Sequence, residues 1–421
     1  MSRKRGVVFL AGLCAGFAAW LVAAPAALAQ SDFYKGKVVS IVLGDPPGGA
    51  ADTYARLFAR ELPRFLPGAP TIIVRSMPGA SSLLSANYVY KTAPRDGTVI
   101  GMPQAAAVFT RLFGNPAALF EPNEFQWIGN LDQATGTCSA WKGSGLTSFA
   151  DLLNTPTLLA ATSPSGLASE YPRAFNAIYG TRARVIHGYP GTSDILVAMQ
   201  NGEAQGSCAF MVSSLRSAFK TYFESGELKP IIQTARRDPT LAGVPHILDF
   251  ARDEDERSVM RLVTDRDIMA RTLLVAPGVP ADRVAALRAA FDAIVKDKEF
   301  LDGAARASLP INPSSAAEVD ALVKSMTGAK PEHIARARAA LESGVTENAD
   351  LKSLSGVVAM SGPSSVDIAD KDGGRRAIKL APERSVVMIA GAPGKVEALQ
   401  PGMACALRYG ADDVAEFVIC K

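Results

Sequence analysis

Two stretches near the start of the chain each join a short, β-branched apolar run to a glycine-bearing turn and a helical pattern. The first covers residues 38–66 (VVSIVLGDPPGGAADTYARLFARELPRFL), and the second begins at 71–77 (TIIVRSM). Continuous apolar runs of this length suit strands buried on both faces of a parallel sheet. With a helix at 81–91 and a further strand at 98–103, the alternation of strands and helices predicts a doubly wound α/β domain.

The same alternation repeats over residues 129–235, which predicts a second α/β domain. Its expected strands and helices lie at 134–140, 147–154, 157–161, 168–179, 183–187, 192–201 and 228–235. Further along, a strand at 271–277 and two helices, the second over 315–342, are expected to return to the first domain. The first domain is therefore predicted to comprise residues 30–128 and 236–343.

From residue 344 the sequence changes to short alternating segments between turns. This sequence pattern predicts a small all-β module over residues 344–421. Asp372-Gly373 is typical of a hairpin turn within it.

The first 29 residues have the layout of a secretory signal peptide. Residues 3–5 form a basic head, an apolar run follows to about residue 23, and Ala27-Leu28-Ala29 offers small residues for cleavage after Ala29. A membrane anchor is the alternative, because the apolar run approaches the length that spans a bilayer. Cleavage would leave 41 basic and 41 acidic residues, a balance that gives no reason to expect nucleic acid or an anionic membrane as a partner.

Four cysteines lie beyond this leader: Cys138, Cys208, Cys405 and Cys420. An even number in an exported chain allows two disulfides. We favour the pairs 138–208 and 405–420, because Cys405 and Cys420 lie close in sequence on segments that resemble neighbouring strands. Four buried thiols are the alternative, and the spacing does not fit a zinc site.

The sequence offers little for catalysis. APGK at 392–395 lacks the remainder of a phosphate loop, no G-x-S-x-G occurs, and His187, His246 and His333 are scattered along the chain. DEDE at 253–256 is interpreted as a solvated charge run. We therefore expect no enzymatic activity, no metal site and no cofactor.

The turn after the first strand is the first candidate binding site, because open α/β sheets bind ligands at the carboxyl ends of their strands. Gly48 and Gly49 let backbone N–H groups approach a ligand, and the helix that starts near Ala50 adds its positive end. Asp52 is either a ligand-binding residue or an organiser of the turn. The second role is favoured, because the charge of Asp52 would repel an anion.

Further turns offer hydroxyl donors. Ser81 and Ser82 follow the second strand, and the second domain contributes ATSPSGLASE at 161–170 and HGYPGTSDI at 187–195. A serine or threonine at such a position is also an ordinary helix N-cap, and this alternative stays open for each of them. Together, these donors favour a cleft that binds a carboxylate without desolvating an Arg or Lys.

Three stretches resemble the solute-binding receptors of tripartite tricarboxylate transporters, the Bug-type family. They are 38–66 with Pro-Pro-Gly-Gly-x-x-Asp, 70–101 with a Pro-Gly-Ala loop and Pro-x-Asp-Gly-Thr, and 226–250 with Arg…Val-Pro. The resemblance covers residues 33 to about 340. It implies an α/β fold of the type II-like, two-domain periplasmic binding protein class, here with the small β module appended.

The resemblance also implies a carboxylate held between the two domains, with one end near the first-domain turns. Matched residue by residue, the ligand-binding positions are Gly48, Gly49, Ala50, Asp52, Ala80, Ser81, Ser163, Ser165, Gly166, Ser169, Gly191 and Thr192. The chain departs from the family pattern at residues 81 and 82, where serines replace glycines, and at 187–191, where HGYPG replaces the usual Val-Pro-Tyr-Lys-Gly.

The expected function is that of a monomeric periplasmic protein. It would capture a small organic carboxylate and deliver it to the membrane permease of a tripartite tricarboxylate transporter. The alternative is a receptor that presents its liganded form to a sensor protein, with the β module as the docking part. A secreted enzyme fits the sequence less well.

Overall fold

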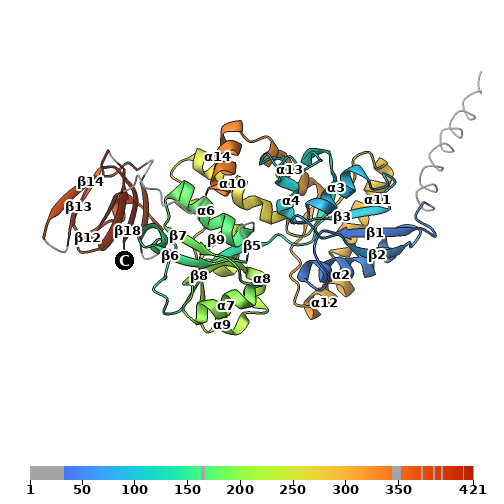
Figure 1. Cartoon of the computed structure of the whole chain (residues 1–421), viewed down its shortest axis with the longest axis horizontal. Helices are drawn as coiled ribbons and strands as arrows, with labels where there is room; N and C mark the ends of the chain where they lie inside the picture. Colours follow the sequence, from blue (N-terminus) through green and yellow to red (C-terminus); the bar gives the residue numbers. More distant parts are fainter. Residues whose placement is uncertain are drawn as a thin grey trace, which may run out of the picture.

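The computed structural model describes residues 33–162, 166–343, 352–370, 373–382, 385–389, 392–410 and 412–420. They form three units, each built on one sheet and arranged along the long axis of the molecule (Figure 1). The predicted signal peptide, Ser163, Ser165 and Asp372 lie outside these residues. Within them, no helix is long and apolar enough to cross a membrane.

The sheet of the first unit has six strands in the order β11-β4-β10-β3-β1-β2. The strands are β1 (Val38–Leu43), β2 (Thr71–Ser76), β3 (Val99–Met102), β4 (Gln126–Asn130), β10 (Thr272–Val275) and β11 (Ser314–Ser315). β1, β2 and β3 are parallel, as predicted, whereas β10 runs antiparallel to β3 and β4. The predicted burial on both faces is correct for β1 and wrong for β2. As an edge strand, β2 has no neighbour on one side, and Ile73 is 41% exposed.

Helices cover both faces of this sheet. They are α2 (Ala50–Phe65), α3 (Leu83–Lys91), α4 (Ala105–Phe109), α11 (Ala281–Ile294), α12 (Lys298–Arg306) and α13 (Ala316–Thr327). On one face, α2, α11 and α12 bury Phe58, Leu62 and Phe291 in a core with Ile41 of β1. On the other face, α3, α4 and α13 pack on the side that contains Trp127. The carboxyl ends of β1 and β2 are left free to form turns.

The second unit has a five-stranded sheet in the order β7-β6-β8-β5-β9. The strands are β5 (Thr135–Trp141), β6 (Thr157–Ala160), β7 (Ala183–Ile186), β8 (Gly206–Met211) and β9 (Leu228–Ala235). The helices are α5 (Asp151–Asn154), α6 (Leu167–Tyr179), α7 (Thr192–Gln200), α8 (Val212–Arg216) and α9 (Lys220–Glu224). The predicted disulfide between Cys138 and Cys208 joins the neighbouring strands β5 and β8.

Two later helices, α10 (Glu254–Thr264) and α14 (Pro331–Glu342), pack against α6 of the second unit and against each other. A single helix was expected over 315–342. The structure has α13 and α14 instead, because Pro331 lacks a backbone N–H and stands in the first turn of a new helix. The assignment of residues 236–343 to the first domain stays a prediction, since β10 and β11 join the first sheet while these helices lie on α6.

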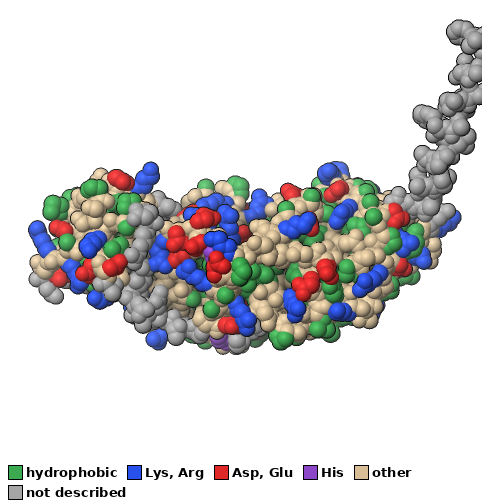
Figure 2. Space-filling model, turned by 90° about the horizontal axis from the view of Figure 1, so that it is seen from above, with side chains coloured by type: hydrophobic (Ala, Val, Ile, Leu, Met, Phe, Trp, Pro, Cys, Tyr) green, Lys and Arg blue, Asp and Glu red, His purple; other side chains and the backbone are tan. Residues whose placement is uncertain are grey.

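Charged side chains of both signs gather over α10 and α14, on the face shown in Figure 2. Within the DEDE run, Asp253 caps α10 by accepting a hydrogen bond from the Glu256 N–H. Glu256 is buried and forms ion pairs with Arg252 and Arg336. The interpretation of this run as solvated is therefore wrong for Glu256, whose charge the two arginines compensate.

The C-terminal unit is a seven-stranded sheet in the order β14-β13-β12-β17-β18-β15-β16. Its strands are β12 (Lys352–Ser361), β13 (Ser365–Ala369), β14 (Arg375–Lys379), β15 (Val386–Ile389), β16 (Ala392–Gly394), β17 (Ala404–Tyr409) and β18 (Ala415–Cys420). It is the predicted β module, in which β15 and β18 pair in parallel. The predicted disulfide between Cys405 and Cys420 joins β17 to β18, and Ile419 packs against the core of the second unit.

Short 3-10 helices complete the chain. They are η1 (Pro122–Glu124), η2 (Pro239–Leu241), η3 (Ile247–Phe250), η4 (Asp265–Met269) and η5 (Val396–Ala398). η4 matters most for the site, because it links α10 to β10 and so passes between the first two units. The segment from β4 to β5 also crosses between these units, as does the turn between α13, which contacts β4, and α14, which contacts α6.

Candidate functional site

The turn between β1 and α2, residues 44–49, is called the glycine turn here. Gly48 has φ +88°, a conformation that favours glycine, and its N–H donates a hydrogen bond of 3.0 Å to Asp52 Oδ2. The same oxygen accepts from Arg56 Nε at 2.9 Å, and this bond holds the pKa of the buried Asp52 below its usual value. Asp52 is thus bound to its own turn. A Cβ at Gly48 or at Gly49 would meet no atom within 4 Å, so the turn faces open space.

The turn between β2 and α3, residues 77–82, is called the serine turn. Ala80, Ser81 and Ser82 follow one another with φ +46°, +53° and +72°. A left-handed conformation costs a non-glycine residue about 1–2 kcal/mol, so three in succession form a strained segment. Such strain persists only where the surroundings enforce it, and it concentrates at functional sites.

The two turns hold each other in place. Ser82 Oγ donates a hydrogen bond of 2.8 Å to the Gly44 carbonyl, and both groups are buried. A Cβ at Gly44 would overlap Ser82 Oγ and lie 2.6 Å from Ser85 Oγ. Gly44 is therefore the point at which the end of β1 meets the start of α3, and only a residue without a side chain fits there.

Two cavities between the first and second units border these turns. The serine-turn cavity, of about 470 Å³, is lined by Ala80 and Ser81 on one side and by Gly166 and Leu167 at the start of α6 on the other. The glycine-turn cavity, of about 700 Å³, is lined by Gly48, Gly49, Ala50 and, across from them, residues of α8. Met211 and Arg271 line both cavities, which are therefore adjacent parts of one cleft.

The remaining candidates of the second unit are less close to this cleft. Ser169 is fully buried, with Oγ 3.0 Å from His187 Nε2, and belongs to the lining of neither cavity. Gly191 is the N-cap residue of α7, and neither it nor Thr192 lines these cavities. Of the candidates in the described part of the chain, the structure brings together Gly48, Gly49, Ala50, Ala80, Ser81 and Gly166.

Charged residues that the sequence reasoning did not select also line the cleft. In the serine-turn cavity they are Asp45, Glu170, Arg266, Asp267 and Arg271. In the glycine-turn cavity they are Asp132, Arg216, Lys220 and Arg271. The expectation of a cleft with uncharged donors alone is therefore wrong. Asp45 directly follows β1 and could have been selected from the sequence, whereas tertiary packing brings the others to the cleft.

The charges of the cleft differ in their surroundings. Arg266 is buried and forms an ion pair with Glu170. Burial raises the pKa of Asp267 to about 6, against the effect of Arg266, and Asp267 accepts a hydrogen bond from the Tyr171 hydroxyl. Burial likewise raises the pKa of Asp132 to about 6, against the effect of Arg271. The guanidinium of Arg271 lies over the Tyr54 ring, 5.4 Å from its centroid.

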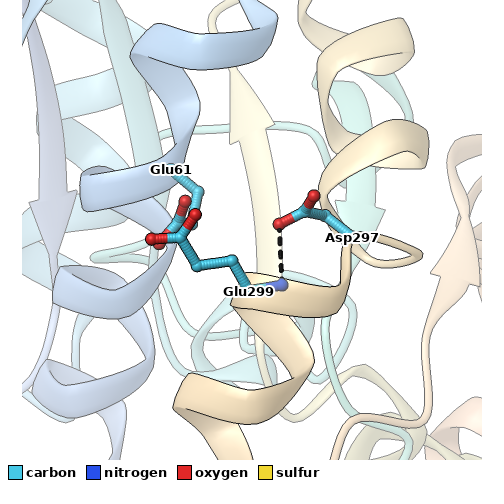
Figure 3. A group of neighbouring side chains, drawn as sticks. All are labelled: Glu61, Asp297 and Glu299. Carbon is cyan, nitrogen blue, oxygen red and sulfur yellow. Dashed lines mark hydrogen bonds between the residues drawn. The ribbon is translucent and has the colours of Figure 1, made fainter.

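One acidic group outside the cleft has the arrangement of a metal site: Glu61, Asp297 and Glu299 (Figure 3). Arg64 Nη1 forms ion pairs with all three, at 2.5, 3.2 and 3.0 Å. Asp297 also caps α12 by accepting hydrogen bonds from the N–H groups of residues 299 and 300. The cluster is accounted for as an ion-pair network that ties α2 to α12.

No protein-family model matches the chain. Among curated proteins, it is 34% identical over 103 residues to the UPF0065 protein in the gbd 5' region of Cupriavidus necator, which is 24% of this chain and 31% of that protein. It is 27% identical over 184 residues to the UPF0065 protein in the TAR-I ttuE-ttuC' intergenic region of Agrobacterium vitis, which is 42% of this chain and 52% of that protein. The matched parts thus span about a third and about half of these relatives.

Solved structures align over a larger part of the chain. A TctC solute binding protein from Polaromonas has a TM-score of 0.56 at 17% identity, with 73% of this chain and 99% of that chain covered. MatC from Rhodopseudomonas palustris with bound malate has 0.50 at 18%, covering 73% and 99%. The periplasmic binding protein BugD has 0.50 at 19%, covering 72% and 96%. These neighbours are receptors of the TctC and Bug type, and they confirm the predicted two-domain fold.

Proposed function

We propose that this protein is a periplasmic solute-binding protein that captures a small organic carboxylate between its first two units and delivers it to a membrane permease. The observation that carries the proposal is the cleft itself. Two turns at the carboxyl ends of parallel strands lie across shared cavities from the start of α6. Open α/β sheets bind ligands at this place, and the fold is that of solute-binding proteins.

The chemistry of the cleft favours an anionic group. The start of α2, a helix of 16 residues, lines the glycine-turn cavity, and the helix dipole adds positive potential there. Arg216, Lys220 and Arg271 line that cavity, with Asp132 as its acidic residue. Malate, the ligand of MatC, is a carboxylate. We propose the six candidates that face the cleft, Gly48, Gly49, Ala50, Ala80, Ser81 and Gly166, as its ligand-binding residues.

Capture would involve a hinge motion. The cavities are lined by both units, so a ligand can contact both only when the cleft is closed, and it would thereby shift the population toward the closed form. The crossings between the units, at 131–134, at η4 and at 328–330, are the segments that would bend. We also propose that residues 30–128 and 236–343 form one of the two moving domains and that residues 129–235 form the other.

A thermal-shift screen tests the proposal with a matched pair of variants. Gly49→Val places a side chain in the glycine-turn cavity, where a Cβ meets no atom within 4 Å and φ is −86°. Gly243→Val is the control, because Gly243 is exposed, has no atom within 4 Å of a Cβ, and does not line this cleft. Each variant is compared with its own ligand-free form, since valine is a poor N-cap residue at position 49.

At a hundred times its dissociation constant, a true ligand stabilises the native state by about 2.7 kcal/mol. We expect some mono-, di- or tricarboxylate to give such a shift with the wild type and Gly243→Val, and a much smaller shift with Gly49→Val. A clear shift with sugars or amines and none with any carboxylate would sink the proposal.

Delivery to a transporter is tested in cells. Deletion of the protein should abolish uptake of the carboxylate identified in the screen, and the wild-type chain should restore it. Normal uptake together with loss of a carboxylate-induced transcriptional response would favour a sensor protein as the partner.

A further inference from the structure

The lining of the serine-turn cavity has more negative than positive groups. Three carboxylates, Asp45, Glu170 and Asp267, face two guanidinium groups, Arg266 and Arg271. The adjoining glycine-turn cavity has the opposite excess, with one carboxylate and three basic side chains. The cleft is therefore electrically asymmetric, and a ligand that occupies both parts meets potentials of opposite sign.

Three of the five charges in the serine-turn cavity have partners within the protein. Glu170 and Arg266 form an ion pair, and Asp267 accepts a hydrogen bond from the Tyr171 hydroxyl. Asp267 is also buried, whereas Asp45 and Arg271 are half-buried and have no ion pair among the described residues. The two charges that remain for a ligand are Asp45 and Arg271.

Asp45 is half-buried at the end of β1. Its Oδ1 accepts a hydrogen bond of 2.7 Å from Gln104 Nε2, which is a neutral donor. Among the residues that the structure describes, no Lys, Arg or His forms an ion pair with Asp45. A carboxylate without a cationic partner in the protein can form a charge-assisted hydrogen bond with a cationic group of a ligand.

Arg271 is half-buried at the start of β10 and lines both cavities. Its Nη1 donates 2.7 Å to the Ala270 carbonyl, and its Nε is buried without a hydrogen-bond partner. No ion pair of Arg271 is present in the described parts of the chain. Its guanidinium can therefore receive a carboxylate of the ligand at the border of the two cavities.

We infer that the captured carboxylate also carries a cationic amino group, so that its ammonium meets Asp45 in the serine-turn cavity and its carboxylate meets Arg271. This inference rests on the proposed function and narrows it to amino carboxylates. A dicarboxylate would place its second negative charge beside Asp45, where repulsion at low dielectric constant disfavours it. An ammonium group has three N–H donors, and Asp45 and Ser81 offer oxygen acceptors in the lining of this cavity.

A panel of matched ligands tests the inference by calorimetry on the whole exported protein. For each chain length from three to six carbons, the panel contains the monocarboxylate, the α,ω-dicarboxylate, the ω-amino carboxylate and the α-amino acid. We expect the tightest amino carboxylate to bind at least tenfold more tightly than the monocarboxylate and dicarboxylate of the same length, a difference of about 1.4 kcal/mol.

The variant Asp45→Asn isolates the charge, because an asparagine keeps the oxygen that accepts from Gln104. It should remove the preference for amino carboxylates and leave the plain carboxylates bound as before or more tightly. Asp302→Asn is the matched control: Asp302 is on α12, 48% exposed and paired with Lys298 alone among the described residues. This control should keep the preference.

The outcomes separate this inference from the function on which it rests. If a dicarboxylate binds the wild type as tightly as the amino carboxylates do, or if Asp45→Asn keeps the preference, the inference is wrong and carboxylate capture stands. If the wild type binds no carboxylate in any form, both the inference and the proposed function are contradicted.

Discussion

The glycine turn and the serine turn occupy equivalent places in one sheet and use opposite means to expose their backbone. The glycine turn has residues without side chains at positions where a Cβ would meet nothing within 4 Å. The serine turn keeps side chains and places Ala80, Ser81 and Ser82 at positive φ. The first turn is open at little local strain, whereas the second is strained and depends on its contact with Gly44. This difference shows that the backbone conformation of the serine turn, unlike that of the glycine turn, depends on contacts with the surrounding fold.

Adding a side chain at that contact should give the largest effect. In Gly44→Ala, the new Cβ overlaps Ser82 Oγ and lies 2.5 Å from Ser82 Cβ, so the two turns must separate. Overpacking of this kind costs about 1–3 kcal/mol, and we expect the upper end because both neighbours are buried. The measurement is the midpoint of urea unfolding of the protein.

A second substitution checks the cause. Ser82→Gly removes both the overlapping atoms and the left-handed strain, so Gly44→Ala with Ser82→Gly should recover about half of the lost stability. Wild-type stability of Gly44→Ala, or the absence of any recovery in the double variant, would show that the turns do not depend on each other.

The cavities beside the two turns extend the comparison. Each contains a buried carboxyl group whose pKa burial raises to about 6, Asp267 beside the serine turn and Asp132 beside the glycine turn. Asp267 lies beside Arg266 and the Tyr171 hydroxyl. Asp132 likewise has Arg271 and the Tyr54 hydroxyl as neighbours that favour its charged form. The two sites differ in that Arg266, beside Asp267, is itself buried.

Replacement of Asp132 should give a pH-dependent gain of about 3 kcal/mol, because its pKa is raised from 3.8 to about 6 and each pKa unit corresponds to about 1.4 kcal/mol. The folded pKa of about 6 lies above the unfolded value of 3.8, so the unfolded chain ionises first and wild-type stability falls between about pH 4 and pH 6. Asp132→Asn should match the wild type near pH 3.5 and exceed it above pH 6, as measured by melting temperature across this range.

Asp267→Asn provides the comparison. Its gain above pH 6 should be smaller, because the substitution also removes a negative charge beside the buried Arg266. An equal gain for both variants would mean that the charge of Asp267 does not stabilise the buried Arg266. A flat pH profile of Asp132→Asn minus wild type would contradict the role of burial.

The sequence was sufficient for the parts of this site that local patterns determine. The apolar runs and glycines predicted β1, β2, both turns and α2, because each depends on neighbours within a few residues. The local patterns did not predict the edge position of β2, because the register and the neighbours of a strand are tertiary properties. They also did not predict the division between α13 and α14. Arg266 and Arg271 were missed for the same reason: the path of η4 between the units brings them to the cleft.

The smallest expected effect comes from placing a serine in the glycine turn and a glycine in the serine turn. Gly49 has φ −86° and ψ 176° at the N-cap of α2, with no side chain to cap it, so Gly49→Ser should stabilise the fold by about 0.5 kcal/mol. Ser81→Gly should give a similar gain, since relief of the left-handed strain exceeds the added chain entropy. Gly48→Ser is the control and should be destabilising, because Gly48 has φ +88°.

If both Gly49→Ser and Ser81→Gly stabilise the free protein, the stability of the fold does not explain why position 49 is a glycine and position 81 a serine. Access of the ligand to the cleft would then be the explanation. Gly49→Ser places a hydroxyl in the glycine-turn cavity and should weaken carboxylate binding despite its more stable fold. Ser81→Gly removes a hydroxyl from the serine-turn cavity and should weaken the binding of amino carboxylates more than that of plain ones. Melting temperatures with and without ligand measure both effects. Unchanged affinity in both variants would show that the two turns are not part of the binding site.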